Sequence, residues 1–342
     1  MIMLQRSDPV LLALAGAACI SVSGAFVKAS GADPGTAAFV RCVLALLLLA
    51  PMAVVELRRL GRRPARFLAT DFAAGLLLGT DYVLWTASIE QVGAGIATVL
   101  LNIQLVVFPL LALVFTGTRA PRSFLVAAPV MLAGVALAAG IADPGSGTAG
   151  DGGDALLGLV YGCAAGVAYA GYLFLSRLGG GRGHSSTPVC TSTMGAAVAA
   201  AIVGGLWTGI HPGELDPAGW GWLALLALTG QVLTWLLVGA ALPRLAPSTG
   251  AAVLVLPPVL AVGVGALFLG EYPSVLQIAG CLLVVLAVWG TERAARRGTR
   301  GRPEPAAESG TAPGGDAGGD ARPAPEDLDG LPEAGGRPRE QA

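Results

Sequence analysis

The most constraining feature of this sequence is a series of ten apolar segments, each about 20 residues long. They lie at approximately 9–29, 34–55, 67–88, 93–115, 121–141, 154–176, 188–210, 219–241, 247–269 and 273–290. About 20 apolar residues are needed for a helix to cross a bilayer core, where every backbone amide must be bonded internally. Runs of this length without alternating polarity favour helices over barrel strands. The predicted class is therefore an all-α integral membrane protein with ten transmembrane helices.

Composition and charge exclude several other classes of protein. Apolar residues make up 54% of the chain and charged residues only 13%, so an ordinary soluble enzyme is excluded. The net charge of −1 offers no basic patch, and no nucleic-acid partner is expected. The five cysteines lie in apolar segments without a CxxC pair, which indicates buried side chains rather than a metal site.

Basic residues concentrate in alternate loops between the predicted helices. The positive-inside rule places these loops, and with them both termini, in the cytoplasm. The opposite side has Lys28 as its only Lys or Arg. The predominance of arginine over lysine is typical of a GC-rich bacterial genome and favours the plasma membrane, the bacterial inner membrane. The arginines of the alternate loops are Arg58, Arg59, Arg62, Arg63, Arg66, Arg119, Arg122, Arg177, Arg182 and Arg244.

The sequence repeats itself in two halves. A shift of 153 residues places 95–117 over 248–270 and carries the third, fourth and fifth helices onto the eighth, ninth and tenth without a gap. Because each half holds an odd number of helices, the two halves enter the membrane in opposite senses, as a 5+5 inverted repeat. The predicted domains are 1–146 and 147–290. A disordered cytoplasmic tail, 291–342, follows them and is rich in Gly and Pro.

Several motifs carry a family resemblance. The second helix contains an arginine within PGTAAFVRCVLALLLLAP, and the ninth and tenth helices read AAVLVLPPVLAVGVGALFLGEYPSVLQIAG, with Pro258, Gly270 and Glu271. Together with the ten spans and the two halves, these motifs resemble the EamA family of the drug/metabolite transporter superfamily. The first half departs from the pattern, since Leu105 and Thr118 stand where the repeat would place Pro and Glu. The resemblance implies export or uptake of small metabolites by alternating access.

Arg41 and Asp81 are the two charges deepest within the predicted helices. Each costs about 2.5–3.5 kcal/mol at a helix centre on insertion scales, so something must offset that cost. They pair with each other, or they face a watery cavity in which Arg41 holds a carboxylate and Asp81 holds an amine or a proton. A third alternative is that Arg41 extends outward to the membrane surface.

Aromatic and amide side chains extend this candidate site. Trp85 lies four residues after Asp81 on one helix face, and Ser88 follows on the same face. The eighth helix repeats this spacing with Gln231 and Trp235. The alternative for each residue is packing or hydrogen bonding between helices. The candidate substrate-binding residues are Arg41, Asp81, Trp85, Gln104, Tyr169, Gln231 and Trp235.

Other features concern packing and movement. Pro257 and Pro258 remove two amide donors inside the ninth helix, which makes them a candidate hinge or a static kink. Glu271 is expected at a solvated end of that helix. Close approach between helices is predicted at two groups of glycines with GxxxG spacing, Gly158, Gly162 and Gly166 in the sixth helix and Gly75 and Gly79 in the third.

The sequence favours one function and leaves two alternatives. It predicts a secondary transporter that exports small organic metabolites or drugs, driven by a proton gradient or by the gradient of the solute. No HExxH, GxSxG or P-loop motif is present, so no cofactor is predicted and an enzyme is disfavoured. An intramembrane enzyme would need a second acid beside Asp81. A non-transporting scaffold would instead turn Asp81, Gln104, Gln231 and Tyr169 into satisfied contacts.

Overall fold

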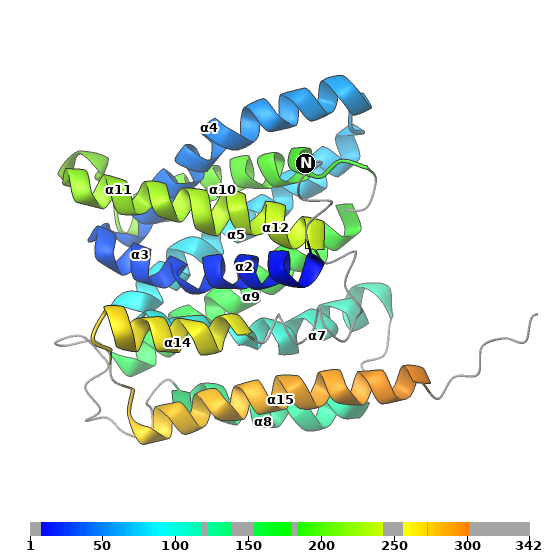
Figure 1. The fold of residues 1–342 in the computed structure, drawn as a ribbon, viewed down its shortest axis with the longest axis vertical. Helices are drawn as coiled ribbons and strands as arrows, with labels where there is room; N and C mark the ends of the chain where they lie inside the picture. The colour runs from blue at the N-terminus through cyan, green and yellow to red at the C-terminus, as the bar shows by residue number, and fades with distance from the viewer. Residues whose placement is uncertain are drawn as a thin grey trace, which may run out of the picture. The chain divides into compact units, whose positions relative to one another are not determined.

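The computed structural model of the chain describes residues 8–117, 122–138, 154–179, 183–241, 256–271 and 273–300. Every regular element in these residues is a helix (Figure 1). In order they are α2 (Pro9–Ser21), α3 (Ser23–Ser30), α4 (Pro34–Leu60), α5 (Ala65–Val92), α6 (Ala94–Leu100), η1 (Leu101–Ile103), α7 (Gln104–Thr116), α8 (Arg122–Ala138), α9 (Ala155–Gly179), α10 (Ser186–Trp207), η2 (Pro212–Glu214), α11 (Pro217–Leu226), η3 (Ala227–Leu233), α12 (Thr234–Ala241), α14 (Leu256–Phe268) and α15 (Val275–Arg300).

Many of these helices are long and apolar enough to cross a membrane. Within the described residues, 7 candidate spans are found, and three shorter apolar helices lie at Ala127–Ala138, Val259–Phe268 and Val275–Ala287. The shorter helices fall in the fifth, ninth and tenth predicted spans, and part of the fifth and of the ninth lies outside the described residues. The all-helical, multi-pass membrane class is confirmed, and the count of ten stays a prediction. The spans are Pro9–Ser30, Pro34–Leu60, Ala65–Val92, Ala94–Thr116, Ala155–Gly179, Ser186–Trp207 and Pro217–Leu237.

Two of the spans are not regular α-helices. The 3₁₀ turn η1 separates α6 from α7, and the π-helical segment η3 separates α11 from α12. In η3 the hydroxyl of Thr234 donates to the carbonyl of Thr229, five residues earlier, at 2.8 Å. Both segments change the angle between successive side chains. The regular α-helical spacing predicted for Gln231 and Trp235 therefore does not apply, because Gln231 lies in η3.

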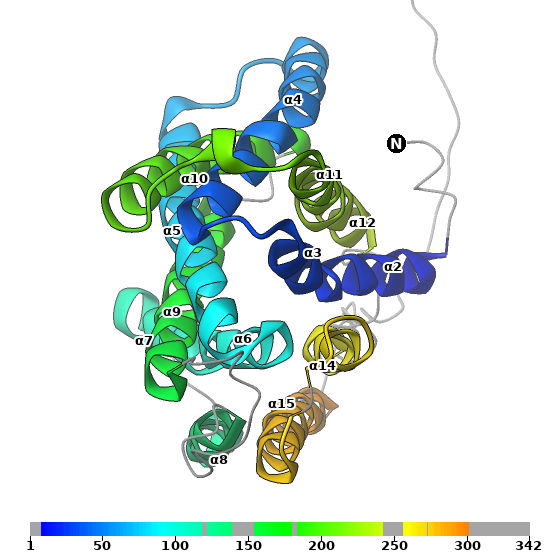
Figure 2. The ribbon, with the colours of Figure 1, turned by 90° about the vertical axis from the view of Figure 1, so that its left-hand side faces the viewer.

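Helix α5 lies between α9 and α10 (Figure 2). It runs antiparallel to α9, since Gly158 faces Val92 at one end and Gly179 faces Asp71 at the other. It runs parallel to α10, because Gly75 faces Ser192 and the next turn faces Ala196. These directions are the ones expected for helices that cross a membrane alternately in the predicted order.

Helices α4 and α10 are antiparallel and joined at both ends. The carboxylate of Glu56, near the end of α4, accepts bonds from the backbone amides of residues 185–187 at the start of α10, at 2.6–3.0 Å. At the opposite end, the amide of Gly35 donates to the hydroxyl of Thr208 at 2.9 Å. The His211 amide donates to the Thr36 hydroxyl at 2.9 Å.

The packing of one half recurs in the other. The pairs α4–α10 and α8–α15 each join helices that the 153-residue shift superposes, and α6–α14 joins the fourth and ninth spans, which the shift also superposes. The α5–α9 contact joins the third and sixth spans. Its counterpart under the shift joins the eighth and first spans, and α11 and α12 do pack on α3 and α2. The helix contacts are therefore similar when the two halves are exchanged.

Glycines allow the close approach of α5 to α10. A Cβ atom on Gly79 would collide with the backbone carbonyl of Ala196, which cannot rotate away as a side chain could. We expect Gly79→Ala to lower the free energy of unfolding by about 1–3 kcal/mol, because the helices must move apart. Thermal unfolding of the purified protein in detergent measures this loss.

Gly221 provides the matched control for that substitution. It lies in α11 with no heavy atom within 4 Å of a built Cβ. Gly221→Ala is expected to leave the unfolding temperature unchanged or slightly raised, because alanine is the better helix former. Equal losses from both variants would show that the α5–α10 contact does not limit stability.

The last described helix extends beyond the predicted start of the tail. α15 continues to Arg300, so residues 291–300 are helical, and the predicted domain boundaries themselves stay a prediction. Alanines and arginines there are good helix formers, and extending an existing helix needs no new nucleus. Arg293 also lies over the ring of Trp289, 4.4 Å from its centroid. Residues 301–342 lie outside the described residues, and the predicted disorder there is untested.

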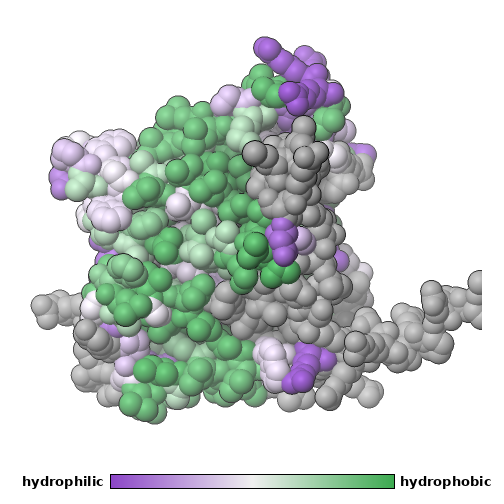
Figure 3. Space-filling model, in the orientation of Figure 1, coloured by the Kyte–Doolittle hydropathy of each residue, from purple (hydrophilic) through white to green (hydrophobic). Residues whose placement is uncertain are grey.

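Apolar side chains cover much of the surface between the helix ends. Figure 3 shows hydrophobic residues over the middle of one face and hydrophilic residues toward the ends of α4 and α11. Among the large exposed side chains are Leu11, Leu225, Leu267 and Leu282. A band of this kind is typical of a surface that faces lipid.

Candidate substrate site

Arg41 of α4 is buried beside the aromatic ring of Tyr82 on α5. Its side chain is 4% exposed, and its Cζ lies 3.8 Å from the ring centroid, a distance typical of a cation–π contact. Gly230 of η3 lies beside its guanidinium, since a Cβ there would be 3.4 Å from Nη2. The Nε atom is buried without a hydrogen-bond partner. Arg41 therefore faces inward and does not extend to the membrane surface.

A chain of hydrogen bonds leads from Tyr82 to the second half of the protein. The Tyr82 hydroxyl donates to Oε1 of Gln231 at 2.5 Å, and Nε2 of Gln231 donates to the Thr193 hydroxyl at 3.0 Å. Gln231 and Thr193 are both fully buried. These hydrogen bonds join α5, η3 and α10 beside the guanidinium of Arg41, which lies over the Tyr82 ring.

Asp81, the neighbour of Tyr82, is buried and not in an ion pair. It is 3% exposed, and its Oδ1 has no hydrogen-bond partner. The ion pairs of the described residues are Lys28–Glu271, Arg63–Asp71 and His211–Asp33. The direct Arg41–Asp81 pair, one of the alternatives from the sequence, is therefore absent from the part of the chain that the structure describes.

Aromatic rings extend the cluster toward α12. Tyr169 and Tyr172 of α9 are stacked with centroids 5.8 Å apart, and Tyr172 meets Trp235 edge to face at 5.7 Å. Tyr82 packs in the same hydrophobic cluster as Tyr172, with Tyr169 and Trp235 against it. The fold thus gathers five predicted residues, Arg41, Asp81, Tyr169, Gln231 and Trp235.

Trp85 and Gln104 are less closely tied to that cluster. Trp85 packs with Val40 and Leu100 in a different hydrophobic cluster, and its Nε1 is buried without a partner. The Oε1 of Gln104 is likewise buried without one. Asn102 satisfies its own amide group, since Nδ2 donates to carbonyls of its own helical segment at 3.0 and 3.3 Å.

Several other expectations have structural outcomes. Ser88 donates to the Gly158 carbonyl at 2.8 Å and so serves helix packing. The three glycines of α9 pack against α5, α6 and η1, as their spacing predicted. Pro257 and Pro258 lie in the first turn of α14, and the residues before Leu256 lie outside the described residues. The hinge therefore stays a prediction.

Sequence reasoning missed Tyr82 and Thr193. Tyr82 lies one residue from the face expected to carry the site, yet α5 is surrounded closely enough that adjacent faces are buried. Thr193 lies in a run of small polar residues, TSTMG, that resembles ordinary packing. The only available signal was the adjacency of a tyrosine to the intramembrane Asp81.

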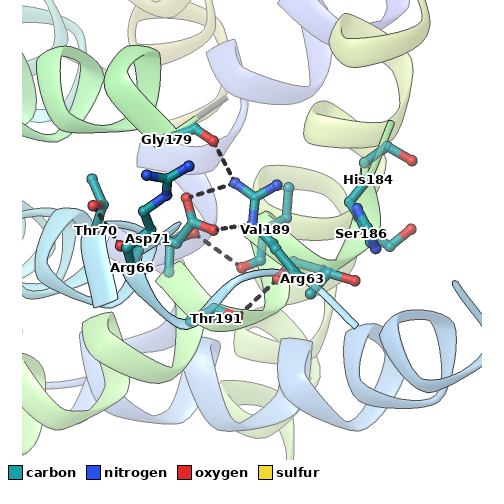
Figure 4. A network of polar contacts seen from close by, with 12 residues as sticks. Arg63, Arg66, Thr70, Asp71, Gly179, His184, Ser186, Val189 and Thr191 are labelled. Atoms are coloured by element: carbon teal, nitrogen blue, oxygen red, sulfur yellow. Dashed lines mark hydrogen bonds and ion pairs between the residues drawn. The ribbon is translucent and has the colours of Figure 1, made fainter. Parts of the chain in front are cut away.

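The sequence predicted Glu271 at a solvated helix end, and the structure instead buries it. It is 8% exposed and bonded to Lys28 and to α6, because the end of α14 packs against the start of that helix. Arg63, expected to act only in topology, is also buried. Figure 4 shows it between Asp71 and the carbonyl of Gly179.

An exposed group of possible metal ligands lies near the start of α4. Ligand atoms of Asp33, His211 and Glu214 all lie within 4.8 Å of one another. His211 Nδ1 is 3.3 Å from Asp33 Oδ2, so these residues already interact. The group joins α4 to the segment after α10.

Comparison with known families decides the classification. The model of the EamA-like transporter family matches residues 9–140 and 156–292. The chain belongs to the EamA-like transporter family. The family model matches twice, as the sequence repeat predicted, and the family is part of the drug/metabolite transporter superfamily. Membership of this family identifies a membrane transporter in general terms.

One solved structure, described only as the crystal structure of a protein, has a similar fold. It is 15% identical, with a TM-score of 0.59, and the match covers 85% of this chain and 98% of that chain. At this identity it bears on the fold alone. None of the curated proteins matches the chain.

Proposed function

We propose that this EamA-like protein is a secondary transporter that exports small organic solutes across the plasma membrane by alternating access. Its ten helices form a 5+5 inverted repeat, with the solute site between the halves. Both termini lie in the cytoplasm. The proposal names a carboxylate-bearing solute as the ligand of Arg41, and an amine or a proton as the ligand of Asp81.

The main support is that Arg41 and Asp81 carry opposite charges, are both buried, and form no ion pair within the described residues. A buried charge without a partner is costly, and it is retained in membrane helices chiefly on substrate or ion pathways. The two residues carry unpartnered polar atoms, Nε and Oδ1, within the described residues. The carboxylate of a solute would pair with Arg41. An amine of the same solute, or a proton, would pair with Asp81.

Helix packing supports the inverted repeat. In α4–α10 and α8–α15, helices that correspond under the sequence repeat lie antiparallel, and Gly134 and Gly280 allow the second pair to approach closely. Antiparallel contact between corresponding helices is what a pseudo-twofold axis in the membrane plane produces.

The alternatives receive less support. A scaffold should satisfy its buried polar groups, yet Asp81 and Gln104 keep unpartnered oxygens. An intramembrane enzyme would need a second acid close to Asp81. Arg41 and Tyr82 occupy that neighbourhood instead.

Transport by inside-out vesicles tests the proposal. Vesicles that contain the protein are expected to accumulate a member of a metabolite panel against its gradient, and empty vesicles are not. If a proton on Asp81 drives transport, Asp81→Asn should abolish uphill transport between acid and neutral pH, because an amide side chain does not take up and release a proton. Undiminished uphill transport by the Asp81→Asn variant across that pH range would contradict proton coupling through Asp81. No accumulation of any solute by either vesicle would contradict the proposed function.

A further inference from the structure

The Glu271 carboxylate joins the two halves at one end of the helices. Its Oε1 accepts bonds from Lys28 Nζ on α3 and from the Ala94 amide, both at 2.9 Å, and Oε2 accepts from the Gly95 amide at 3.2 Å. Ala94 and Gly95 begin α6, whose positive dipole end favours a carboxylate. We call Lys28, Glu271 and the amides of Ala94 and Gly95 the Glu271 latch.

The surrounding backbone is shaped to receive this carboxylate. Gly270, two residues after the end of α14, has φ +65, which is the left-handed conformation, and the Glu271 amide donates to the Gly265 carbonyl at 3.1 Å. A Cβ on Gly93 would lie 2.9 Å from the Glu271 Cδ, and one on Gly265 2.5 Å from Oε2. Two positions without side chains thus make room for one charged group.

Two contacts between the halves, α4–α10 and α6–α14, are held differently. Helices α4 and α10 are bonded at both ends, through Glu56 at one and Thr208 at the other. Helices α6 and α14 are bonded at the Glu271 end in the described residues. A pair bonded at both ends is suited to be a pivot. The α6–α14 pair can separate at the Glu271 end once the bonds to Glu271 break.

The Glu271 latch has no equivalent in the sequence repeat. The 153-residue shift places Thr118 opposite Glu271 and Gly181 opposite Lys28, and both lie outside the described residues. Neither side chain can supply a charge. The two residues that the shift pairs with Glu271 and Lys28 therefore cannot form a second charged latch of this kind.

We propose that the Glu271 latch closes the solute pathway on the side opposite the arginine-rich loops and must release there during each transport cycle. The α4–α10 pair stays joined as the pivot. This inference rests on the proposed alternating-access function. The Lys28–Glu271 ion pair is partly accessible, since the Lys28 side chain is 37% exposed, and so Lys28 can exchange this contact for contact with water.

Labelling of an engineered thiol tests the latch. Val262 of α14 lies at the seam, by which we mean the contact between α6 and α14, because its Cα would be 2.9 Å from a Cβ on Gly95. With the five native cysteines replaced, Val262→Cys in the full chain in liposomes is treated with a membrane-impermeant maleimide. Glu271→Ala should speed labelling about tenfold, because the buried charge-assisted bonds that hold the seam shut are lost. Lys28→Met should give a smaller increase, since it leaves the amide bonds in place.

Glu56→Ala is the matched control, because Glu56 also accepts helix-terminal amides across the two halves. It should leave the labelling of Val262→Cys unchanged. Equal labelling of Glu271→Ala and its parent, or an equal increase from Glu56→Ala, would overturn the latch. If Glu271→Ala does not fold, unchanged labelling in Lys28→Met and Glu271→Gln overturns it instead. Faster labelling without solute movement in vesicles would contradict the transport function and leave the latch in place.

Discussion

Arg41→Gln is expected to reduce transport at least about a hundredfold while leaving the unfolding temperature within a few degrees of the parent. The loss of transport follows because the proposed function makes Arg41 the buried charge that binds the solute. The small change in stability follows because Arg41 is not in an ion pair within the described residues. Losing an unpaired buried charge offsets losing the cation–π contact with Tyr82. Vesicle transport and thermal unfolding measure the two effects.

Two variants make the role of Arg41 specific. Arg41→Lys keeps the charge but not the planar guanidinium that stacks on Tyr82, so it should recover only part of the transport. Tyr82→Phe keeps the ring and breaks the bond to Gln231, so it should weaken solute binding more than maximal rate. If Arg41→Gln unfolds the protein and Arg41→Lys restores both folding and full transport, Arg41 has a structural role instead.

Arg63→Ala should lower the free energy of unfolding by about 3–5 kcal/mol. Arg63 Nε lies 2.9 Å from Asp71 Oδ2, and the two side chains are 1% and 3% exposed. Arg63 Nη2 also donates to the Gly179 carbonyl at 2.5 Å (Figure 4). Removing Arg63 leaves the Asp71 charge buried without its partner and opens the contact between α5 and α9. Equilibrium unfolding in detergent measures the loss.

Arg62 is the matched control for this prediction. It is the preceding arginine of the same loop and is exposed. Arg62→Ala should change stability by less than about 0.5 kcal/mol. The double variant Arg63→Met with Asp71→Leu should regain much of the loss, because no buried charge remains unpaired. Similar losses for Arg62→Ala and Arg63→Ala would show that the ion pair contributes little.

The fold class could be read from the sequence because it depends on local hydrophobicity. Nearly every predicted span has a helix at its place, from α2 at Pro9 to the start of α15. The irregular segments η1 and η3 could not be predicted, because neither contains a proline or another sequence signal for a change of helical pitch. The extension of α15 to Arg300 was missed because composition alone suggested a tail.

The candidate site was only partly predictable. Arg41 and Asp81 could be singled out from the sequence, because placing a charge inside a transmembrane helix costs free energy. Both residues are buried in the structure. Their surroundings were not predictable, since Tyr82 and Thr193 join the cluster through contacts across three helical elements. Gln104 follows directly after η1, where the directions of successive side chains depart from regular α-helical spacing.

By itself, the sequence determined the membrane environment, the duplicated halves and the family, because each depends on the order and apolarity of residues along the chain. Only the tertiary structure decided which charges are paired. Arg63 and Asp71 form an ion pair, Lys28 reaches Glu271 from 243 residues away, and Arg41 is left beside an aromatic ring. Pairing energy depends on distance and on exclusion of water, and neither quantity is encoded at any single position of the chain.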